Sequence, residues 1–426
     1  MHFRNLIASS LVAGAFVVAG CGSSSPGDTP TRESATSTVV LSPSAGPASS
    51  RTPTGGPTPT GGPGSPRATE GPPIVETAST ARLEQYQGSR SITPLQAYGD
   101  KILVASQLRP APGYADLDSD YQYLLWDPAS GEFSPAWAGQ AARQDLVTGT
   151  DDEWVTTLRT GLSLPFPNWS LILRNPGTGE SRTIAEADPQ VVKTPGLQPK
   201  LPLGFAPDPR ISAGRVIWDV IEVDASGEPH DRIYLYDIKT DSRVVLYEAT
   251  DPRIEEIWSP TIGGNRAAWL RRATPDSTFE IVVRDLLNGM DEIVTGVGGP
   301  YSAGLSEDGR YLAWDDGMVA KWALDLESGK RVLYSEAHGG QLEGWGTVMS
   351  GHYAGWSPKA RTGAKGGFYD FKTGVVRFIA VPMDTAMNTA RVMGKWFVWQ
   401  HRELDPDNLV TTKPAYYSFL PLEGGR

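Results

Sequence analysis

The sequence predicts an all-β fold, a seven-bladed β-propeller of four-stranded antiparallel blades. Two repeats predict it, a Gly–Trp unit and an Asx–Gly turn unit, which alternate along the chain. The distribution of residue types sets the boundary of the fold. All thirteen Trp residues lie after residue 80, whereas Pro, Gly, Ser and Thr are concentrated before it. The propeller is therefore expected over residues 81–426.

The first repeat places Trp five residues after Gly, in Gly149–Trp154 and in four later copies. Gly214–Trp218 is one residue shorter, and Gly99 has Val104 in the Trp position, which makes seven units. Flat aromatic side chains bury a large area between adjacent sheets, so these residues are expected to pack blade against blade. The predicted packing residues are Trp154, Trp218, Trp269, Trp314, Trp356 and Trp399.

The second repeat, Asp/Asn-x-x-Ser/Thr/Asn-Gly, follows each of the first six Gly–Trp units. Its copies start at Asp127, Asn175, Asp237, Asp285, Asp325 and Asp370, and Asp241 replaces the Gly of the third. The Asx side chain accepts hydrogen bonds from backbone N–H groups ahead of it, and Gly adopts the left-handed conformation. The unit therefore predicts a hairpin turn between the third and fourth strands of a blade.

The seventh unit has only one further strand, near Tyr416–Phe419, after Trp399. Its fourth strand must come from elsewhere. Residues 88–92 match residues 179–184, which occupy the fourth-strand position of the second blade. We therefore expect the segment around Ser89 to Thr93 to complete the last blade and close the ring, which removes exposed edges.

One copy of the first repeat carries a family resemblance. Ser306-Glu-Asp-Gly-Arg-Tyr-Leu-Ala-Trp314 is similar to the Ser-Pro-Asp-Gly-Arg signature of the TolB-like propellers with WD40-like repeats, and Ser259-Pro260 matches the start of that signature. As a pattern the resemblance extends over residues 88–426. It implies the same propeller fold.

Residues 1–20 have the pattern of a signal peptide: Arg4, the apolar run Leu6–Val18, and small residues. The run is too short for an ordinary membrane span. Val18-Ala19-Gly20-Cys21 resembles the lipobox of bacterial lipoproteins, which implies that Cys21 is acylated and becomes the N-terminus. Two or three acyl chains would anchor the chain stably at the extracytoplasmic face of the cell membrane, or in the outer membrane of a diderm. The alternative is an ordinary secretory signal with a chance Cys.

Residues 21–80 are expected to form the lipidated Cys and a disordered spacer, with Pro-Thr-Gly-Gly-Pro at Pro53–Pro57 and Pro59–Pro63.

The net charge of −11 belongs to the folded part, since residues 1–80 have four basic and four acidic residues. An acidic domain without a Lys/Arg stripe argues against nucleic-acid binding. Because Cys21 is the only Cys, intramolecular disulfides and Cys-based metal sites are excluded.

Propellers usually bind ligands where the loops between the second and third strands of each blade gather. Long loops of this kind are expected at Arg109–Asp120, Thr160–Trp169, Asp224–Asp231 and Arg402–Pro414. The candidate binding face comprises Tyr114, Asp116, Asp118, Asp120, Trp169, His230, Arg271, Arg272, Lys359, Arg361, His401, Arg402 and Glu403.

Neither a metal nor a cofactor is expected. Asp116-x-Asp118-x-Asp120 has the spacing that begins a calcium loop, but the Gly and terminal Glu of an EF-hand are missing, which favours an acidic surface loop. The His residues in the folded part are scattered singly, without zinc-ligand spacing.

Three classes of propeller enzyme fit poorly. Residues 306–314 resemble a sialidase Asp box with one extra residue, and Ala323–Lys330 is a single quinoprotein-like copy. The Gly-x-Ser-x-Gly motif of prolyl-oligopeptidase hydrolase domains is absent. The leading hypothesis is a monomeric, non-catalytic envelope lipoprotein that binds a protein, peptide or glycan. The alternatives are a propeller lyase or glycoside-acting enzyme using His401, Glu403 or His230, and a purely structural spacer domain.

Overall fold

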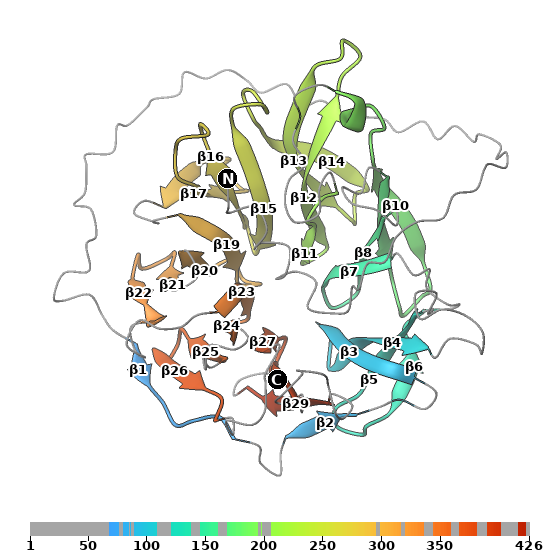
Figure 1. The fold of residues 1–426 in the computed structure, drawn as a ribbon, viewed down its shortest axis with the longest axis vertical. Helices are drawn as coiled ribbons and strands as arrows, with labels where there is room; N and C mark the ends of the chain where they lie inside the picture. Colours follow the sequence, from blue (N-terminus) through green and yellow to red (C-terminus); the bar gives the residue numbers. More distant parts are fainter. Residues whose placement is uncertain are drawn as a thin grey trace, which may run out of the picture.

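The structure is a computed structural model of the 426-residue chain. It describes residues 68–75, 80–84, 86, 89–108, 121–137, 145–160, 168–194, 197, 206–294, 299–316, 320–335, 344–358, 366–380, 390–401 and 416–422. These residues form seven β-sheets that radiate from a central axis, with the first strand of each sheet innermost (Figure 1). The predicted seven-bladed β-propeller is confirmed.

The blades are numbered in chain order. The first contains β3 (Ser89–Tyr98), β4 (Lys101–Leu108), β5 (Tyr121–Trp126) and β6 (Phe133–Pro135). The second contains β7 (Asp145–Thr150), β8 (Val155–Thr160), β9 (Trp169–Arg174) and β10 (Ser181–Glu186). The third contains β11 (Arg210–Ser212), β12 (Arg215–Val223), β13 (Pro229–Asp237) and β14 (Ser242–Glu248). The fourth contains β15 (Glu256–Gly263), β16 (Arg266–Arg272), β17 (Glu280–Asp285) and β18 (Asp291–Val294).

The fifth blade contains β19 (Pro300–Leu305), β20 (Tyr311–Asp316), β21 (Ala320–Asp325) and β22 (Arg331–Leu333). The sixth contains β23 (Gly344–Ser350), β24 (Tyr353–Pro358), β25 (Gly367–Asp370) and β26 (Val375–Phe378), joined by β1 (Thr69–Glu70). The seventh contains β27 (Ala390–Met393), β28 (Trp396–His401), β29 (Tyr416–Pro421) and β2 (Ala81–Leu83). A short 3-10 helix, η3 (Val191–Lys193), follows the second blade in the chain.

The seventh blade takes its outer strand from the N-terminal part of the chain. β2 pairs antiparallel with β29, and Arg82 lies opposite Ser418 (Figure 1). The predicted segment, Ser89–Thr93, is the wrong one, because it belongs to β3 and pairs with β4 of the first blade. A short sequence match between two strands does not show whether a strand is the inner or the outer one of its blade. The hairpin turn at Gly99 joins β3 directly to β4, so β3 is the inner strand of the first blade.

A second N-terminal contact covers the outer edge of the sixth blade. β1 runs parallel to β26, and Ile74 forms a bridge with Ile379. Backbone bonds run from Gly71 N to Val376 O (2.8 Å) and from Ile74 N to Phe378 O (2.6 Å). Ile74 is fully buried. We call residues 68–75 the clasp. The predicted spacer is therefore wrong for this stretch, because Pro-rich chain in an extended conformation can still dock on a strand edge.

The Trp residues lie between the blades, and five of them are at most 1% exposed. Each of these five packs against the preceding blade, as Trp269 does against Ile217 and Ile233 and Trp314 does against Leu270. The seven apolar clusters of the described residues correspond to the seven blade interfaces. Interfaces of this kind, rather than a single central core, bury the apolar surface of the ring.

Trp154 differs from the other five. A bond from Asp151 N to Trp154 O (3.0 Å) closes a turn at residues 152–153, so Gly149 lies within β7 instead of in the turn. Thr157 therefore holds the position that Trp holds in the other copies. Since alternate residues of a strand face opposite sides, Trp154 packs in the cluster with the third blade, beside Trp218. The predicted alignment of this unit is wrong in register.

Polar contacts join neighbouring blades on one face of the ring, where the turn between the first and second strands of each blade lies. Gly264 N donates to Glu307 O (2.7 Å), Gly214 N to Asp151 Oδ2 (2.9 Å) and the Tyr98 hydroxyl to Glu153 O (3.1 Å). The remaining interfaces are joined by Arg215 with Gly264 O, Ser350 with Glu307 and with Gly394 O, and Lys395 with Asp100. All seven interfaces are linked in this way, including the one between the last and first blades.

One interface also contains a buried ion pair. Lys321 Nζ lies 2.9 Å from Asp315 Oδ1 in the fifth blade, and the two side chains are 0% and 5% exposed. Thr347 N of the sixth blade donates to Asp315 Oδ2 (3.1 Å), and the Ser302 hydroxyl donates to the same oxygen (3.1 Å). The pair therefore ties two blades together through a carboxylate whose oxygens are well satisfied.

Candidate binding site

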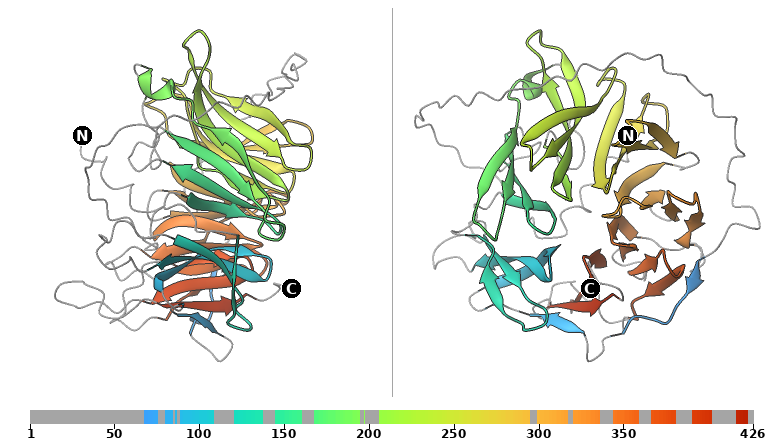
Figure 2. Two further views of the ribbon diagram at one scale, coloured as in Figure 1. Left: turned by 90° about the vertical axis from the view of Figure 1, so that its right-hand side faces the viewer. Right: turned by 180° about the vertical axis from the view of Figure 1, so that it is seen from behind.

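The strand directions divide the ring into two faces, and Figure 2 shows the blades from the side and the ring from behind. The turns between first and second strands, and those between third and fourth strands, lie on one side, which we call the turn face. The second strands end and the third strands begin on the opposite side, which we call the loop face. This is the face on which the sequence places candidate ligand contacts.

Eight of the thirteen predicted contacts fall outside the described residues: Tyr114, Asp116, Asp118, Asp120, Lys359, Arg361, Arg402 and Glu403. The other five lie at loop-face ends of strands: Trp169, His230, Arg271, Arg272 and His401. Trp169 is 5% exposed and packs in the cluster with Trp154 and Trp218. Its assignment as a ligand contact is therefore wrong, because it is part of the apolar interface between the second and third blades.

His230 is held between two carboxylates. Its Nδ1 lies 2.6 Å from Glu248 Oε1, and its Nε2 lies 3.2 Å from Asp224 Oδ2. Glu248 comes from the outer strand β14, and Asp224 begins the turn after β12. Hydrogen bonds from the Ser226 hydroxyl, the Glu228 N–H and His230 lower the pKa of Asp224. Both ring nitrogens are engaged, so His230 is positioned by its neighbours.

Arg232 connects this network to the second strand of the third blade, β12. Its Nε donates to Glu248 Oε2 (2.9 Å), and its Nη1 donates to Glu222 Oε2 (3.2 Å). The Tyr234 hydroxyl donates to the same Glu222 oxygen (2.5 Å). Burial, together with this bond to Glu222, raises the pKa of Tyr234 to about 12. Burial opposes ionisation of Glu248, but the hydrogen bonds from Arg232 and His230 outweigh it and lower the pKa.

A matching network lies on the fourth blade. Arg271 Nε donates to Glu280 Oε1 (2.6 Å), and Arg271 Nη1 lies 3.4 Å from the Tyr247 hydroxyl of the third blade. That hydroxyl donates to Glu255 Oε1 (2.5 Å). Tyr247 faces the fourth blade and Glu248, the next residue of β14, faces the second, so the two networks are separate sets of contacts on opposite sides of the third blade. Both lie at loop-face ends of strands, and together we call them the polar band. The band comprises Glu222, His230, Arg232, Glu248, Arg271 and Glu280.

Arg272 faces the other side of the fourth blade. It pairs with Glu256, and its guanidinium lies 5.0 Å from the ring centre of Phe279. Phe279 in turn packs edge-on against Trp258, with 5.6 Å between ring centres. The partly buried aromatic pair and the cation together form a second surface suited to flat or apolar ligand groups.

His401 lies at the loop-face end of the seventh blade. Its ring stacks on Tyr416 at 4.3 Å between centres, with 6° between the planes. Its Nε2 lies 2.9 Å from the Ser418 hydroxyl. The guanidinium of Arg82, from the closing strand β2, lies 5.1 Å from the Tyr416 ring centre. His401 is thus part of the join between β2, β28 and β29.

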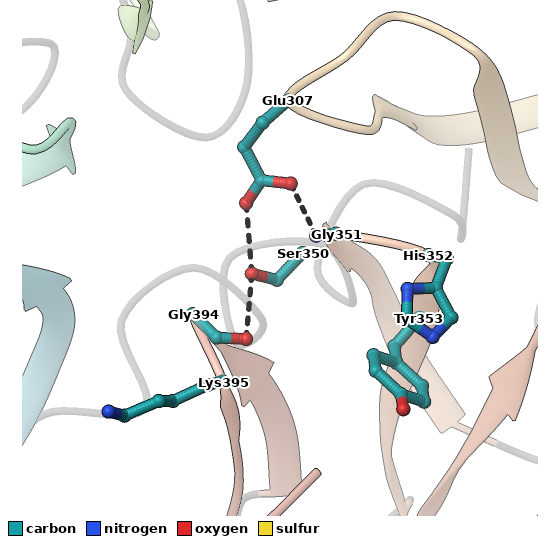
Figure 3. A pocket seen from close by; sticks show the side chains of 7 residues that line it. All are labelled: Glu307, Ser350, Gly351, His352, Tyr353, Gly394 and Lys395. Carbon is teal, nitrogen blue, oxygen red and sulfur yellow. Dashed lines mark hydrogen bonds between the residues drawn. The ribbon is translucent and has the colours of Figure 1, made fainter. Parts of the chain in front are cut away.

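A cavity of about 200 Å³ opens on the turn face between the fifth, sixth and seventh blades. Figure 3 shows Glu307 pointing toward Ser350, with Lys395 directed away from both. The Ser350 hydroxyl lies 2.9 Å from Glu307 Oε1 and 3.1 Å from Gly394 O. These groups satisfy one another across two blade interfaces. Since ligand pockets are usually larger, this cavity is better explained as a junction between blades.

Sequence reasoning missed Glu222, Arg232, Glu248 and Glu280. The sequence contains part of the information needed to find them. Charged residues stand at the ends of neighbouring β-rich runs, and alternate residues of such a run share one side of a blade. Within the described residues no group of three or more His, Cys, Asp or Glu side chains could hold a metal ion. In this part of the chain, none of the helices has the length and hydropathy of a membrane span.

Comparison with known proteins identifies the fold. No protein-family model matches the sequence, and no curated protein matches it. A prolyl endopeptidase structure matches with 10% identity and a TM-score of 0.54, over 80% of this chain and 49% of that one. The propeller domain of the Trilobed protease from Pyrococcus furiosus matches with 8% identity and a TM-score of 0.52, over 79% and 94%. Such low identities establish the β-propeller fold alone.

An acylaminoacyl peptidase from Pyrococcus horikoshii also matches, with 10% identity and a TM-score of 0.50, over 78% of this chain and 51% of that one. This chain spans about half the length of these two peptidases. TolB from Acinetobacter baumannii matches with 14% identity, over 77% and 81%, but its TM-score is 0.36. The resemblance to TolB-like propellers is therefore supported only as far as the shared fold.

Proposed function

We propose that this chain is an extracytoplasmic lipoprotein, anchored through Cys21, whose loop face binds a protein, peptide or glycan partner without catalysing a reaction. The observation that carries the proposal is the polar band on the third and fourth blades. It presents cations and carboxylates at strand ends on the face where propellers usually bind ligands. The lipobox-like stretch Val18–Cys21 supports the anchor.

The contacts within the band support binding over catalysis. Arg232 engages Glu222 and Glu248, Arg271 engages Glu280, and both nitrogens of His230 have partners. A general base needs access to the proton that it removes, whereas these groups already satisfy one another. A preorganised set of charged groups on rigid strands instead favours complementary recognition of a partner surface.

Fractionation tests the anchor. The wild-type chain should sediment with membranes and carry added acyl mass at its N-terminal Cys, and the Cys21→Ser variant should move to the soluble fraction. An unmodified wild-type chain in the soluble fraction would exclude the anchor.

Cross-linking tests the binding face. A photoreactive group at Arg253, which lies beside the band and pairs with Glu228, should capture the partner in intact cells. Arg271→Ala should weaken this capture. Lys330→Ala is the matched control, because it removes an exposed cation from the turn face. Equal loss in both variants would contradict a loop-face site. Turnover of a metabolite that is abolished by His401→Ala or Glu403→Ala would refute the non-catalytic assignment.

A further inference from the structure

The interface between the first and seventh blades contains polar side chains among its apolar ones. Val398 of β28 packs with Ile92 and Val104 of the first blade in one buried cluster. Arg391 lies directly opposite Val398 in the β27–β28 pair, so its side chain faces the first blade as well. We call this interface the closing seam, because it joins the two ends of the ring.

The register places further polar groups in the closing seam, next to Arg391 on its loop-face side. The Arg391 guanidinium donates to Pro94 O of the first blade. Two residues further toward the loop face, Ser106 lies opposite Ile92 in the first blade, and Gln400 lies opposite Tyr417 in the seventh. Because strand residues alternate, Ser106 shares the side of Val104, and Gln400 shares the side of Val398. Both therefore face the gap between the two sheets.

Two of these groups have buried atoms without hydrogen bonds. Gln400 is 3% exposed and Ser106 is fully buried. Gln400 Nε2 lies 2.8 Å from the Tyr417 hydroxyl, but Gln400 Oε1 and Ser106 Oγ make no hydrogen bond. Buried polar atoms almost always form hydrogen bonds, so two such atoms without one in the same interface require an explanation.

Arg391 has an unusual environment as well. Within the described residues its guanidinium makes no ion pair, and its hydrogen bond is to the Pro94 carbonyl. Burial lowers the pKa of Arg391, an effect that the neighbouring Tyr417 partly offsets. Arg391 is partly buried. Cations that are largely removed from water are usually paired with an anion, and none of the described residues supplies one to Arg391.

The structure assigns to the closing seam a binding site for a carboxylate, which enters from the loop face and is held by Arg391, Ser106 and Gln400. One guanidinium and two neutral donors match a single negative charge, and a guanidinium fits a planar carboxylate with two parallel bonds. The oxygen and nitrogen of an amide are assigned from its contacts. With the Gln400 amide turned over, the Tyr417 hydroxyl donates to Oε1, and Nε2 is free to donate to the ligand.

This inference deepens the proposed function and rests on it for the face from which the ligand comes. It is tested with the Cys21→Ser variant of the chain and with sodium acetate as the probe, at constant ionic strength against sodium chloride. Calorimetry and Trp fluorescence should both show saturable acetate binding. Trp126 is a suitable reporter, because it belongs to the apolar cluster of this interface. Its ring centre lies 4.7 Å from that of Phe419.

Arg391→Met should weaken acetate binding by about tenfold or more, as loss of a charge-assisted contact does. Arg266→Met is the matched control, because Arg266 also bridges two blades through a backbone carbonyl, Gly309 O, at 2.9 Å. It should leave acetate binding unchanged. The double variant Ser106→Ala/Gln400→Met keeps the cation and should also bind more weakly, which preserves the test if Arg391→Met does not fold.

N-acetylalanine and glucuronate distinguish a peptide terminus from an acidic sugar as the source of the carboxylate, since the source should bind more tightly than acetate. Non-saturable responses to all three probes, or equal binding by wild type and Arg391→Met, would overturn the site. So would a tighter response to sulfate. Because this titration contains no partner, its failure leaves the cross-linking result at Arg253 as a separate test of the proposed function.

Discussion

The clasp offers a sharp test of how the N-terminal part of the chain holds the ring. Ile74 is fully buried between the edge of the sixth blade and the seventh, in a cluster with Phe368 and Trp399. Truncation of a buried Ile to Ala usually costs ~2–5 kcal/mol. Since the clasp lies at the end of the described fold, the loss should appear as local opening of residues 68–75 with the ring intact.

Hydrogen exchange measures that opening directly. The amides of Gly71 and Ile74 donate to β26, and the Ala380 amide donates to Ile74 O. A loss of ~2 kcal/mol corresponds to about 30-fold faster exchange of these three amides in Ile74→Ala. Val75→Ala is the matched control, because Val75 is 51% exposed and its truncation should leave exchange unchanged. Equal exchange in wild type and Ile74→Ala would show that the clasp is not docked as described.

Three further predictions concern the ring itself. Lys321→Met should lower the free energy of unfolding by ~3–5 kcal/mol because it leaves the Asp315 carboxylate buried and unpaired, and adding Asp315→Leu should recover much of the loss in denaturant titrations. Gly264→Ala should lower the midpoint of thermal unfolding far more than Gly214→Ala. Both positions have positive φ, but a Cβ at Gly264 would lie 2.1 Å from a backbone oxygen of the fifth blade, whereas at Gly214 nothing lies within 4 Å; equal shifts would contradict this close approach. Burial lowers the pKa of His352 below 6.5, so the unfolded chain takes up its proton first and stability should fall as pH drops below about 6.5. His352→Gln should flatten this dependence, and an unchanged pH profile would exclude His352 as its source.

Much of the fold could be predicted because the Asx turn recurs in six blades and a buried Trp recurs at the same position in five. The third Asx turn shows how far this extends, since Asp241 replaces Gly and adopts a positive φ of 51°. The register of the second blade was not predictable from spacing alone, because a turn at residues 152–153 shifts Trp154 to the opposite side of the blade. The clasp was not predictable from composition, because its non-Pro residues still donate backbone bonds to the strand edge although the segment around them is rich in Pro.

The candidate site was predictable only in outline. The sequence placed His230 and Arg271 on the loop face, but their partners Glu248 and Glu280 come from strands whose pairing fixes the contacts. Trp169 could not be distinguished from a ligand contact, since burial depends on the neighbouring blade. The closing seam depends on the register of two blades at opposite ends of the chain, which no local pattern contains.

The ring is closed by the pairing of β2 with β29. Its most direct test is disulfide formation in a Cys21→Ser background, between Arg82→Cys and Ser418→Cys, which lie directly opposite each other. We expect this pair to cross-link rapidly and the cross-linked ring to resist unfolding. Cross-linking of Ser91→Cys with Ser418→Cys instead would contradict the pairing, because that result would place the β3 segment at the outer edge of the seventh blade.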